Sequence, residues 1–247
     1  MTAAAHLPMA SDCVNMVEYT FAGAEPLADA LAAAVATDLQ SAISTRGHAL
    51  LAVSGGKTPT RFLAQLSRRT LAWEHVTVTL VDERWVALED ARSNEGLVRA
   101  TLLQNAAAAA HFVSLHAPSV TEPEGALPAI AKRIAGLERP FDALVLGMGE
   151  DGHCASFFPG GDHLAEATDP HADALVMSMR APGAGEPRIT LTLPVVLDSR
   201  AIYLHIEGER KRRVLQDASN AGKSDRTFPI SQVLRNARAP LNVYWCA

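Results

Sequence analysis

The chain has 247 residues and a formal net charge of −5 at pH 7, and 48% of its residues are hydrophobic. These values fit a globular protein with a substantial core, and the negative charge gives no electrostatic footprint for binding nucleic acid. The sparse cysteines, Cys13, Cys154 and Cys246, fit a reducing cytoplasm better than a disulfide framework or a metal site. No apolar run approaches the length of a membrane span, and residues 1–10 lack the pattern of a secretory signal.

The first recognisable elements are a helix and a buried strand. Apolar residues recur every four positions over residues 26–46, at Leu27, Leu31, Val35, Leu39 and Ile43. This rhythm predicts an amphipathic helix that stops at Gly47. The apolar run over residues 49–53 predicts a buried strand. We expect residues 1–24 to form an N-terminal extension or first strand of one domain that spans residues 1–247.

The turn after this strand has features of a phosphate site. It reads Ser-Gly-Gly-Lys-Thr-Pro over residues 54–59, and a helical pattern follows over residues 60–66. Thr58 is predicted to cap this helix and Pro59 to take its first position. A helix N-terminus attracts anions, Lys57 adds a full positive charge, and Gly55 and Gly56 let the backbone approach a ligand. On the pattern alone, a phosphate site and an ordinary turn between strand and helix are equally good interpretations.

Charged residues follow the next strand, which is predicted over residues 76–81. They are Asp82, Glu83 and Arg84. Arg84 can bind a phosphate through paired donors, whereas a local ion pair is the favoured interpretation of Glu83. Ser93 and Asn94 then open a helix that is predicted to run through Leu103.

A second glycine turn follows an apolar strand over residues 141–146. Gly147, Gly149 and Gly152 fit a dinucleotide-binding pattern formally, but Asp151 and His153 crowd the place of the pyrophosphate. A helix is predicted to begin near His153, where a histidine can exchange protons near neutral pH. The pattern only slightly favours a functional His153 over a structural one. For Cys154, a small buried filler is favoured over a nucleophile.

The rest of the chain keeps alternating strands and helices. Arg188 begins a strand, where contact with a substrate and a strand-edge charge are equally good interpretations. Lys211 lies in a basic first helical turn, which is unfavourable unless an anion such as phosphate is bound nearby. The alternation implies an α/β fold with a mostly parallel sheet flanked by helices on both faces. Further strands are predicted over residues 111–115, 175–177, 188–193, 201–206 and 241–245, and further helices over residues 123–138 and from Gly208 and Pro229.

Several ordered motifs resemble those of the 6-phosphogluconolactonases, which share a superfamily with the glucosamine-6-phosphate isomerases. The motifs are Ser-Gly-Gly-x-Thr-Pro at residues 54–59, Asp-Glu-Arg-x-Val at 82–86, Gly-x-Gly-x-Asp-Gly-His-x-Ala-Ser-x-Phe-Pro-Gly at 147–160, Arg-x-Thr-Leu-Thr at 188–192 and Gly-x-x-Lys at 208–211. The resemblance extends over about residues 25–245. A proline usual in the family after the second motif is Ala87 here.

The resemblance implies a modified Rossmann-like topology and hydrolysis of 6-phospho-D-glucono-1,5-lactone to 6-phosphogluconate, the second step of the oxidative pentose phosphate pathway. It implies no cofactor and no metal. His153 would activate the water, Asp151 would orient His153, and Asp82 would position neighbouring groups or water. The substrate would be bound by Gly55, Gly56, Lys57, Thr58, Arg84, Arg188 and Lys211, with backbone N–H groups of the glycine turns, including Gly149 and Gly152, at the oxyanion.

Two alternatives remain. An aminosugar-6-phosphate isomerase or deaminase would use Asp82 to move a proton between carbons, but those enzymes carry Asp-Glu-Tyr where this chain has Arg84, and Ala-Phe-Asn-Glu-Pro where it has Ala-Ser-Phe-Phe-Pro at residues 155–159. A sugar-phosphate-sensing domain of a transcription regulator would need a preceding helix-turn-helix segment. We expect a cytoplasmic monomer or weak homodimer whose partner is a sugar phosphate lactone, without nucleic acid or membrane.

Overall fold

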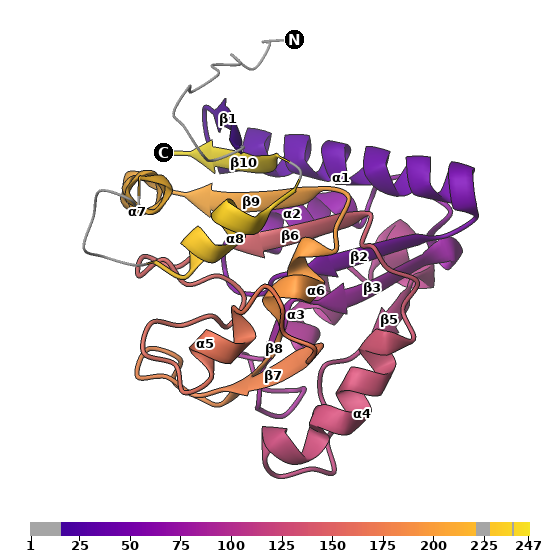
Figure 1. The fold of residues 1–247 in the computed structure, drawn as a ribbon. Helices are drawn as coiled ribbons and strands as arrows, with labels where there is room; N and C mark the ends of the chain where they lie inside the picture. The colour runs from indigo at the N-terminus through magenta and orange to yellow at the C-terminus, as the bar shows by residue number, and fades with distance from the viewer. Residues whose placement is uncertain (1–15, 221–227, 239) are drawn as a thin grey trace.

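The computed structural model describes residues 16–220, 228–238 and 240–247. Seven strands form a parallel sheet in the order β1-β10-β9-β6-β2-β3-β5 (Figure 1). The predicted parallel α/β architecture is therefore confirmed. The strands are β1 (Met16–Phe21), β2 (Ala49–Val53), β3 (Val76–Leu80), β5 (His111–Val113), β6 (Ala143–Gly147), β9 (Ile202–Glu207) and β10 (Leu241–Cys246).

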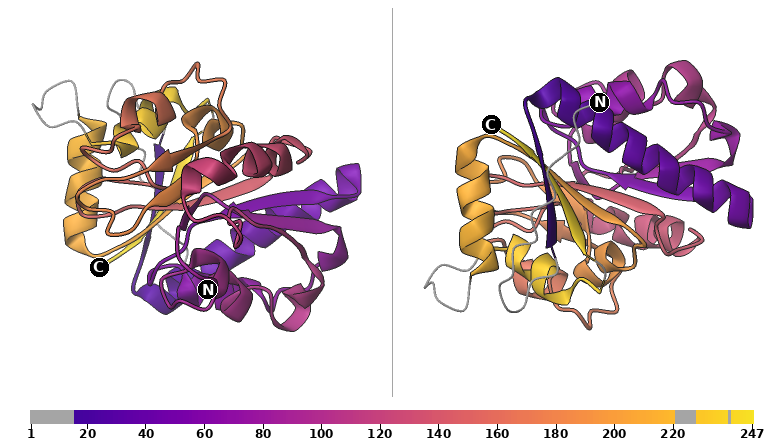
Figure 2. Two further views of the ribbon diagram at one scale, coloured as in Figure 1. Left: turned by 90° about the horizontal axis from the view of Figure 1, so that it is seen from below. Right: turned by 90° about the horizontal axis from the view of Figure 1, so that it is seen from above.

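Helices cover both faces of this sheet. In Figure 2, α1 lies on one face in indigo and α8 lies on the other in yellow. Helix α2 packs against α1, and α6 packs against α8. The helices are α1 (Ala24–Arg46), α2 (Thr60–Leu66), α3 (Asn94–Thr101), α4 (Pro123–Ala135), α5 (Leu164–Ala167), α6 (Leu193–Leu197), α7 (Glu209–Ser219) and α8 (Ile230–Asn236), with short 3₁₀ turns at Trp73–His75 and Asn105–Ala109. In the described ranges, no helix combines the length and hydropathy that crossing a membrane requires.

Helix α1 follows its predicted pattern closely. Leu27, Leu31, Val35 and Leu39 are all fully buried against the sheet. The helix ends at Gly47, which has φ 81° and donates its N–H to the carbonyl of Ile43 at 2.8 Å. A residue with a Cβ is strained in this left-handed conformation, so the glycine terminates the helix at low cost.

A second, antiparallel sheet was not predicted. Its order is β4 (Asp82–Arg84), β8 (Arg188–Leu191) and β7 (Val176–Met179). Val81 joins the two sheets, because its N–H bonds to Val53 at 3.0 Å and its carbonyl accepts from Leu191 at 2.9 Å. The chain therefore leaves the parallel sheet after β3, and Asp82 to Arg84 pair with Arg188 to Thr190. This pairing brings the charged residues Asp82 to Arg84 next to Arg188, which is remote from them in the sequence.

The start of α2 differs from the prediction. The helix begins at Thr60, Pro59 precedes it in the N-cap position, and no side chain caps it. Thr58 is therefore one residue too early to act as the cap. Helix α3 confirms its predicted start, since the hydroxyl of Ser93 accepts from the N–H of Gly96 at 3.0 Å.

Candidate active site

A pocket lies at the carboxyl ends of the central strands. Strand β2 leads on to β3 and β5 in one direction, whereas β6 leads on to β9 and β10 in the other. Ligands of open α/β sheets bind where the strand order reverses in this way. The cavity has a volume of about 270 Å³ and is lined by residues 54–59 after β2, residues 147–149 after β6, and side chains from the small sheet and α7.

Most of the predicted site residues meet in this pocket. Asp151 and Gly152 are not in its wall, but they lie in the turn that carries His153. The lining includes Gly55, Gly56, Lys57, Thr58, Asp82, Arg84, Gly149, His153, Arg188 and Lys211.

His153 is held by two neighbours. Its Nδ1 lies 2.6 Å from Oδ1 of Asp151, and its ring stacks on Phe158 with centroids 4.1 Å apart. Burial acts to raise the pKa of Asp151, but the hydrogen bond and charge of His153 outweigh it and lower that pKa below its ordinary value. An ionised Asp151 accepts the proton on Nδ1. The neutral ring then carries its lone pair on Nε2, where a base is needed.

The glycine turn forms a tight loop rather than the start of a helix. The N–H of Gly149 bonds to the carbonyl of His153 at 2.9 Å, and the N–H of Gly152 bonds to the carbonyl of Gly149 at 3.1 Å. A Cβ on Gly149 would lie 2.3 Å from the ring of His153, so the ring can fold back only over a glycine. The helix predicted to begin near His153 is wrong, because Ala155 takes φ 48° and the chain turns again.

The loop already uses two backbone N–H groups, those of Gly149 and Gly152, that the resemblance assigned to the oxyanion. Since the N–H groups of Gly149 and Gly152 both bond within the turn, neither points freely at a substrate. Gly152 has φ 77°, and a Cβ there would lie 2.6 Å from Phe228. Its role in the structure is thus to let the turn close.

Four cationic side chains from separate segments line the pocket: Lys57, Arg84, Arg188 and Lys211. Arg188 is buried, donates to the carbonyl of Ala184 at 2.7 Å and lies over the ring of Phe158. Burial lowers the pKa of Arg188 and also that of Lys211. Such concentrated positive charge, partly withdrawn from water, is suited to an anion.

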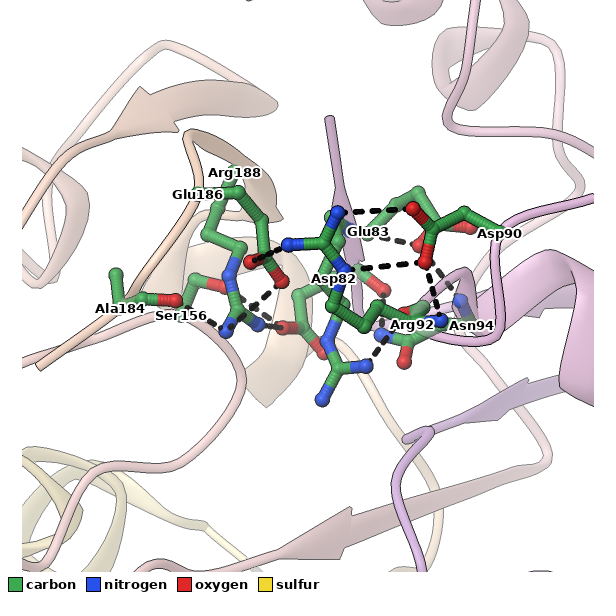
Figure 3. A network of polar contacts seen from close by, with 10 residues as sticks. Asp82, Glu83, Asp90, Arg92, Asn94, Ser156, Ala184, Glu186 and Arg188 are labelled. Carbon is green, nitrogen blue, oxygen red and sulfur yellow. Dashed lines mark hydrogen bonds and ion pairs between the residues drawn. The ribbon is translucent and has the colours of Figure 1, made fainter. Parts of the chain in front are cut away.

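Asp82 is a buried member of the pocket wall. Its carboxylate accepts a hydrogen bond from the hydroxyl of Ser156 at 2.6 Å and lies 3.6 Å from Nη1 of Arg188, as Figure 3 shows. The backbone carbonyl of Asp82 accepts from Nδ2 of Asn94 at 2.8 Å. Asp82 is therefore engaged by the protein on several sides.

Glu83 does not form the local ion pair that the sequence suggested. Its carboxylate accepts from the N–H groups of Arg84, Asn94 and Glu95, each at 2.7 Å. It thus binds the N-terminus of α3, where the free N–H groups and the helix dipole favour a negative charge. Burial nevertheless raises the pKa of Glu83 to about 7.

Sequence reasoning missed several residues of the pocket wall. Asn94 is almost fully buried, and its Oδ1 has no hydrogen-bond partner within the described residues. Its position after Ser93 indicated only a helix start, although its nearness to the charged Asp82 segment was a usable signal. Phe158 also lines the pocket and lies within the motif at residues 147–160, so the sequence contained a signal for it. Gly183 lines the pocket from the loop between β7 and β8, which belongs to the sheet that was not predicted. Cys154 is buried, and burial raises the pKa of its thiol far above the ordinary value, as suits a filler.

The comparison with known proteins places this geometry in a family. Residues 22–245 match the family model described as glucosamine-6-phosphate isomerases/6-phosphogluconolactonase. The chain belongs to this family. Within the glucosamine-6-phosphate isomerase/6-phosphogluconolactonase family, it is 49% identical to a 6-phosphogluconolactonase of Rhizobium meliloti, over 92% of this chain and 97% of the relative.

A further relative and a solved structure are similar to the chain over most of its length. A 6-phosphogluconolactonase of Pseudomonas aeruginosa is 42% identical over 87% of this chain and 88% of its own length. The crystal structure of a 6-phosphogluconolactonase from Shewanella baltica, 38% identical, superposes with a TM-score of 0.88 and covers 94% of this chain and 98% of that one. The family resemblance that the motifs indicated is therefore confirmed.

Proposed function

We propose that this chain hydrolyses 6-phospho-D-glucono-1,5-lactone to 6-phosphogluconate, the second step of the oxidative pentose phosphate pathway. The observation that carries the proposal is the hydrogen-bonded pair of His153 and Asp151 in a pocket lined by four cationic side chains. Lactone hydrolysis needs a base for water, and this substrate needs an anchor for its phosphate. The relatives named 6-phosphogluconolactonase support the same assignment.

The reaction follows from the roles of these groups. Nε2 of His153 takes a proton from water, and the resulting hydroxide attacks the lactone carbonyl carbon. The bond between that carbon and the ring oxygen then breaks, and the imidazolium returns the proton to the ring oxygen. Asp151 keeps Nδ1 protonated and stabilises the positive ring between the two transfers.

The cations provide the anchor. Donors to the phosphate come from four cationic side chains on separate segments of the pocket wall: Lys57, Arg84, Arg188 and Lys211. The turn at Gly55 and Gly56 lines the pocket as well, and we assign its backbone donors to anionic oxygens of the substrate, because those of Gly149 and Gly152 are used within their own loop.

The isomerase alternative is less well supported. That reaction requires a carboxylate that removes a proton from carbon. Asp82 is buried, and its carboxylate accepts from Ser156 and lies beside Arg188, so its oxygens are already engaged in contacts within the protein. A sensing domain without catalysis would have no use for the pairing of His153 with Asp151. We further infer a cytoplasmic monomer or weak homodimer that works without a metal. The free, buried Cys154 and Cys246 fit the reducing conditions of a cytoplasm.

The direct test is acid release from freshly generated 6-phosphogluconolactone, followed by pH-stat against an uncatalysed control because the lactone hydrolyses spontaneously. We expect catalysed release that persists with a chelator. The same protein should incorporate no solvent deuterium at C1 or C2 of glucosamine-6-phosphate, as followed by NMR. Deuterium incorporation that is lost in Asp82→Asn, without lactone hydrolysis, would reverse the assignment in favour of the isomerase.

A further inference from the structure

Arg92 is an exposed residue outside the pocket wall that contacts two segments, each of which leads into an element that contributes residues to the pocket. It lies in the loop between β4 and α3. Its guanidinium binds Asp90 in a two-point contact, with Nε 3.0 Å from Oδ1 and Nη2 2.8 Å from Oδ2. Its third nitrogen, Nη1, lies 2.9 Å from Oε2 of Glu186, in the segment that leads into β8. Figure 3 shows Arg92 between these two carboxylates.

Through Glu186, the guanidinium of Arg92 reaches one cation of the pocket. Oε1 of Glu186, its other oxygen, lies 3.9 Å from Nη2 of Arg188. Glu186 is largely buried, with its side chain 15% exposed, so its charge is only partly screened by water. Arg188 is held from its other side by Asp82, 3.6 Å away. The chain of contacts from Arg92 to Glu186 to Arg188 thus helps to fix where the Arg188 guanidinium lies.

The backbone of Arg92 contacts a second cation of the pocket, Arg84. Nη1 of Arg84 donates to the carbonyl oxygen of Arg92. Asp90 fixes that carbonyl, because its Oδ1 accepts from the N–H of Arg92 at 2.9 Å and its own carbonyl accepts from the N–H of Ser93 at 2.9 Å. The direction of the Arg84 side chain therefore depends on the turn formed by Asp90 and Arg92.

We propose that Arg92 is a positioning residue that sets the separation of the Arg84 and Arg188 guanidinium groups and thereby the affinity for the substrate's phosphate. Two guanidinium groups in one pocket repel each other before an anion arrives. Holding both in advance removes part of the cost of bringing them together on binding. This inference rests on the proposed function, because it takes Arg84 and Arg188 as phosphate ligands.

The side-chain link from Arg92 through Glu186 to Arg188 and the backbone link from Arg92 to Arg84 can be tested separately. Arg92→Ala removes the side-chain link but keeps the backbone carbonyl that binds Arg84. Asp90→Ala loosens both links. For Arg92→Ala we expect KM for the phosphorylated lactone to rise about two- to tenfold, as one or two partly exposed ion pairs allow, with kcat nearly unchanged. Unphosphorylated glucono-1,5-lactone should show no such rise. Arg92→Lys should show a smaller rise in KM for the phosphorylated lactone than Arg92→Ala. Asp90→Ala should show a larger rise in KM than Arg92→Ala.

A double-mutant cycle tests the path through Glu186. If Arg92 acts through that carboxylate, then adding Arg92→Ala to Glu186→Gln should change KM little further. The matched control is Arg69→Ala, which removes another arginine paired with a carboxylate, Asp29 at 2.5 Å, at the end of α2 away from the pocket. The control should keep the wild-type KM.

Three outcomes would overturn the inference: an unchanged KM in Arg92→Ala, an equal loss on both lactones, or an equal loss in Arg69→Ala. A wild-type protein that releases no acid from the lactone would instead refute the proposed function. The inference is then decided by calorimetry with 6-phosphogluconate and gluconate: weaker binding of 6-phosphogluconate alone in Arg92→Ala supports it, and equal affinity in wild type and variant rejects it.

Discussion

The pairing of His153 with Asp151 depends on short-range chain geometry. Gly149 makes room for the imidazole, and the carboxylate two residues before His153 reaches Nδ1. Both residues could be found from the sequence because the glycine turn, the acid and the histidine lie within one short segment. The orientation of Asp151 toward His153 was left open by the glycine between them, and only the folded loop shows it.

Glu83 and Asn94 show where residue-scale prediction fails. The neighbours of Glu83 in sequence suggest an ion pair, yet its partners are N–H groups at residues 94 and 95, which the fold brings to it. Asn94 forms part of the pocket wall for the same reason. The local pattern located the start of α3 in the sequence, but such roles depend on which strand the fold places beside that N-terminus, and no local pattern specifies this position.

Arg84 gives a prediction at this scale. Replacing it with alanine removes a cation from the pocket wall, so KM for the phosphorylated lactone should rise while unphosphorylated glucono-1,5-lactone is affected much less. Steady-state kinetics on both substrates measure the difference. If both substrates lose efficiency by the same factor, Arg84 is a structural residue and the phosphate is held elsewhere.

At the scale of elements, eight of the described strands were predicted to within two residues of their bounds, because apolar runs and glycine turns are local signals, whereas β1 was expected only as part of residues 1–24. The separation of β4 from β3 was not predicted. Residues 76–84 are compatible with one continuous strand, and the break at Val81 is decided by pairing with Leu191, which is remote in sequence. The pairing partner of a short strand is a property of the fold.

The junction of β4 and α3 leads to a prediction about pH. Burial raises the pKa of Glu83 to about 7 from 4.5, so between these values the folded protein binds a proton that the unfolded chain lacks. The stability that Glu83 contributes is therefore fully present below pH 4.5 and is lost as the pH rises through about 7. Thermal unfolding should show a smaller loss of stability from pH 5 to pH 8 in Glu83→Gln than in wild type.

The control for this experiment is Glu74→Gln, which replaces an exposed carboxylate and should keep the wild-type slope. Identical slopes in wild type and Glu83→Gln would show that Glu83 does not titrate in this range. Its carboxylate would then be kept ionised by the N–H donors of α3 despite its burial.

At the scale of the molecule, the pocket lies where two sheets meet. The parallel sheet contributes the two glycine turns, and the small sheet contributes Asp82, Arg84 and Arg188. The alternation of strands and helices predicted the first sheet, and the turns and charged residues that follow its strands were interpreted as possible ligand sites. It could not predict the second sheet, so the convergence of Arg84 with Arg188 followed only from the resemblance between motifs.

The central claim is that His153 is the base for lactone hydrolysis in this pocket. The most direct measurement compares acid release from 6-phosphogluconolactone by wild type and His153→Ala, alongside the affinity of each for 6-phosphogluconate. Turnover should fall by roughly 10²–10⁴-fold, the loss expected for a general base, while product binding is largely retained because the cations are untouched. A variant that hydrolyses the lactone at close to the wild-type rate would contradict the account.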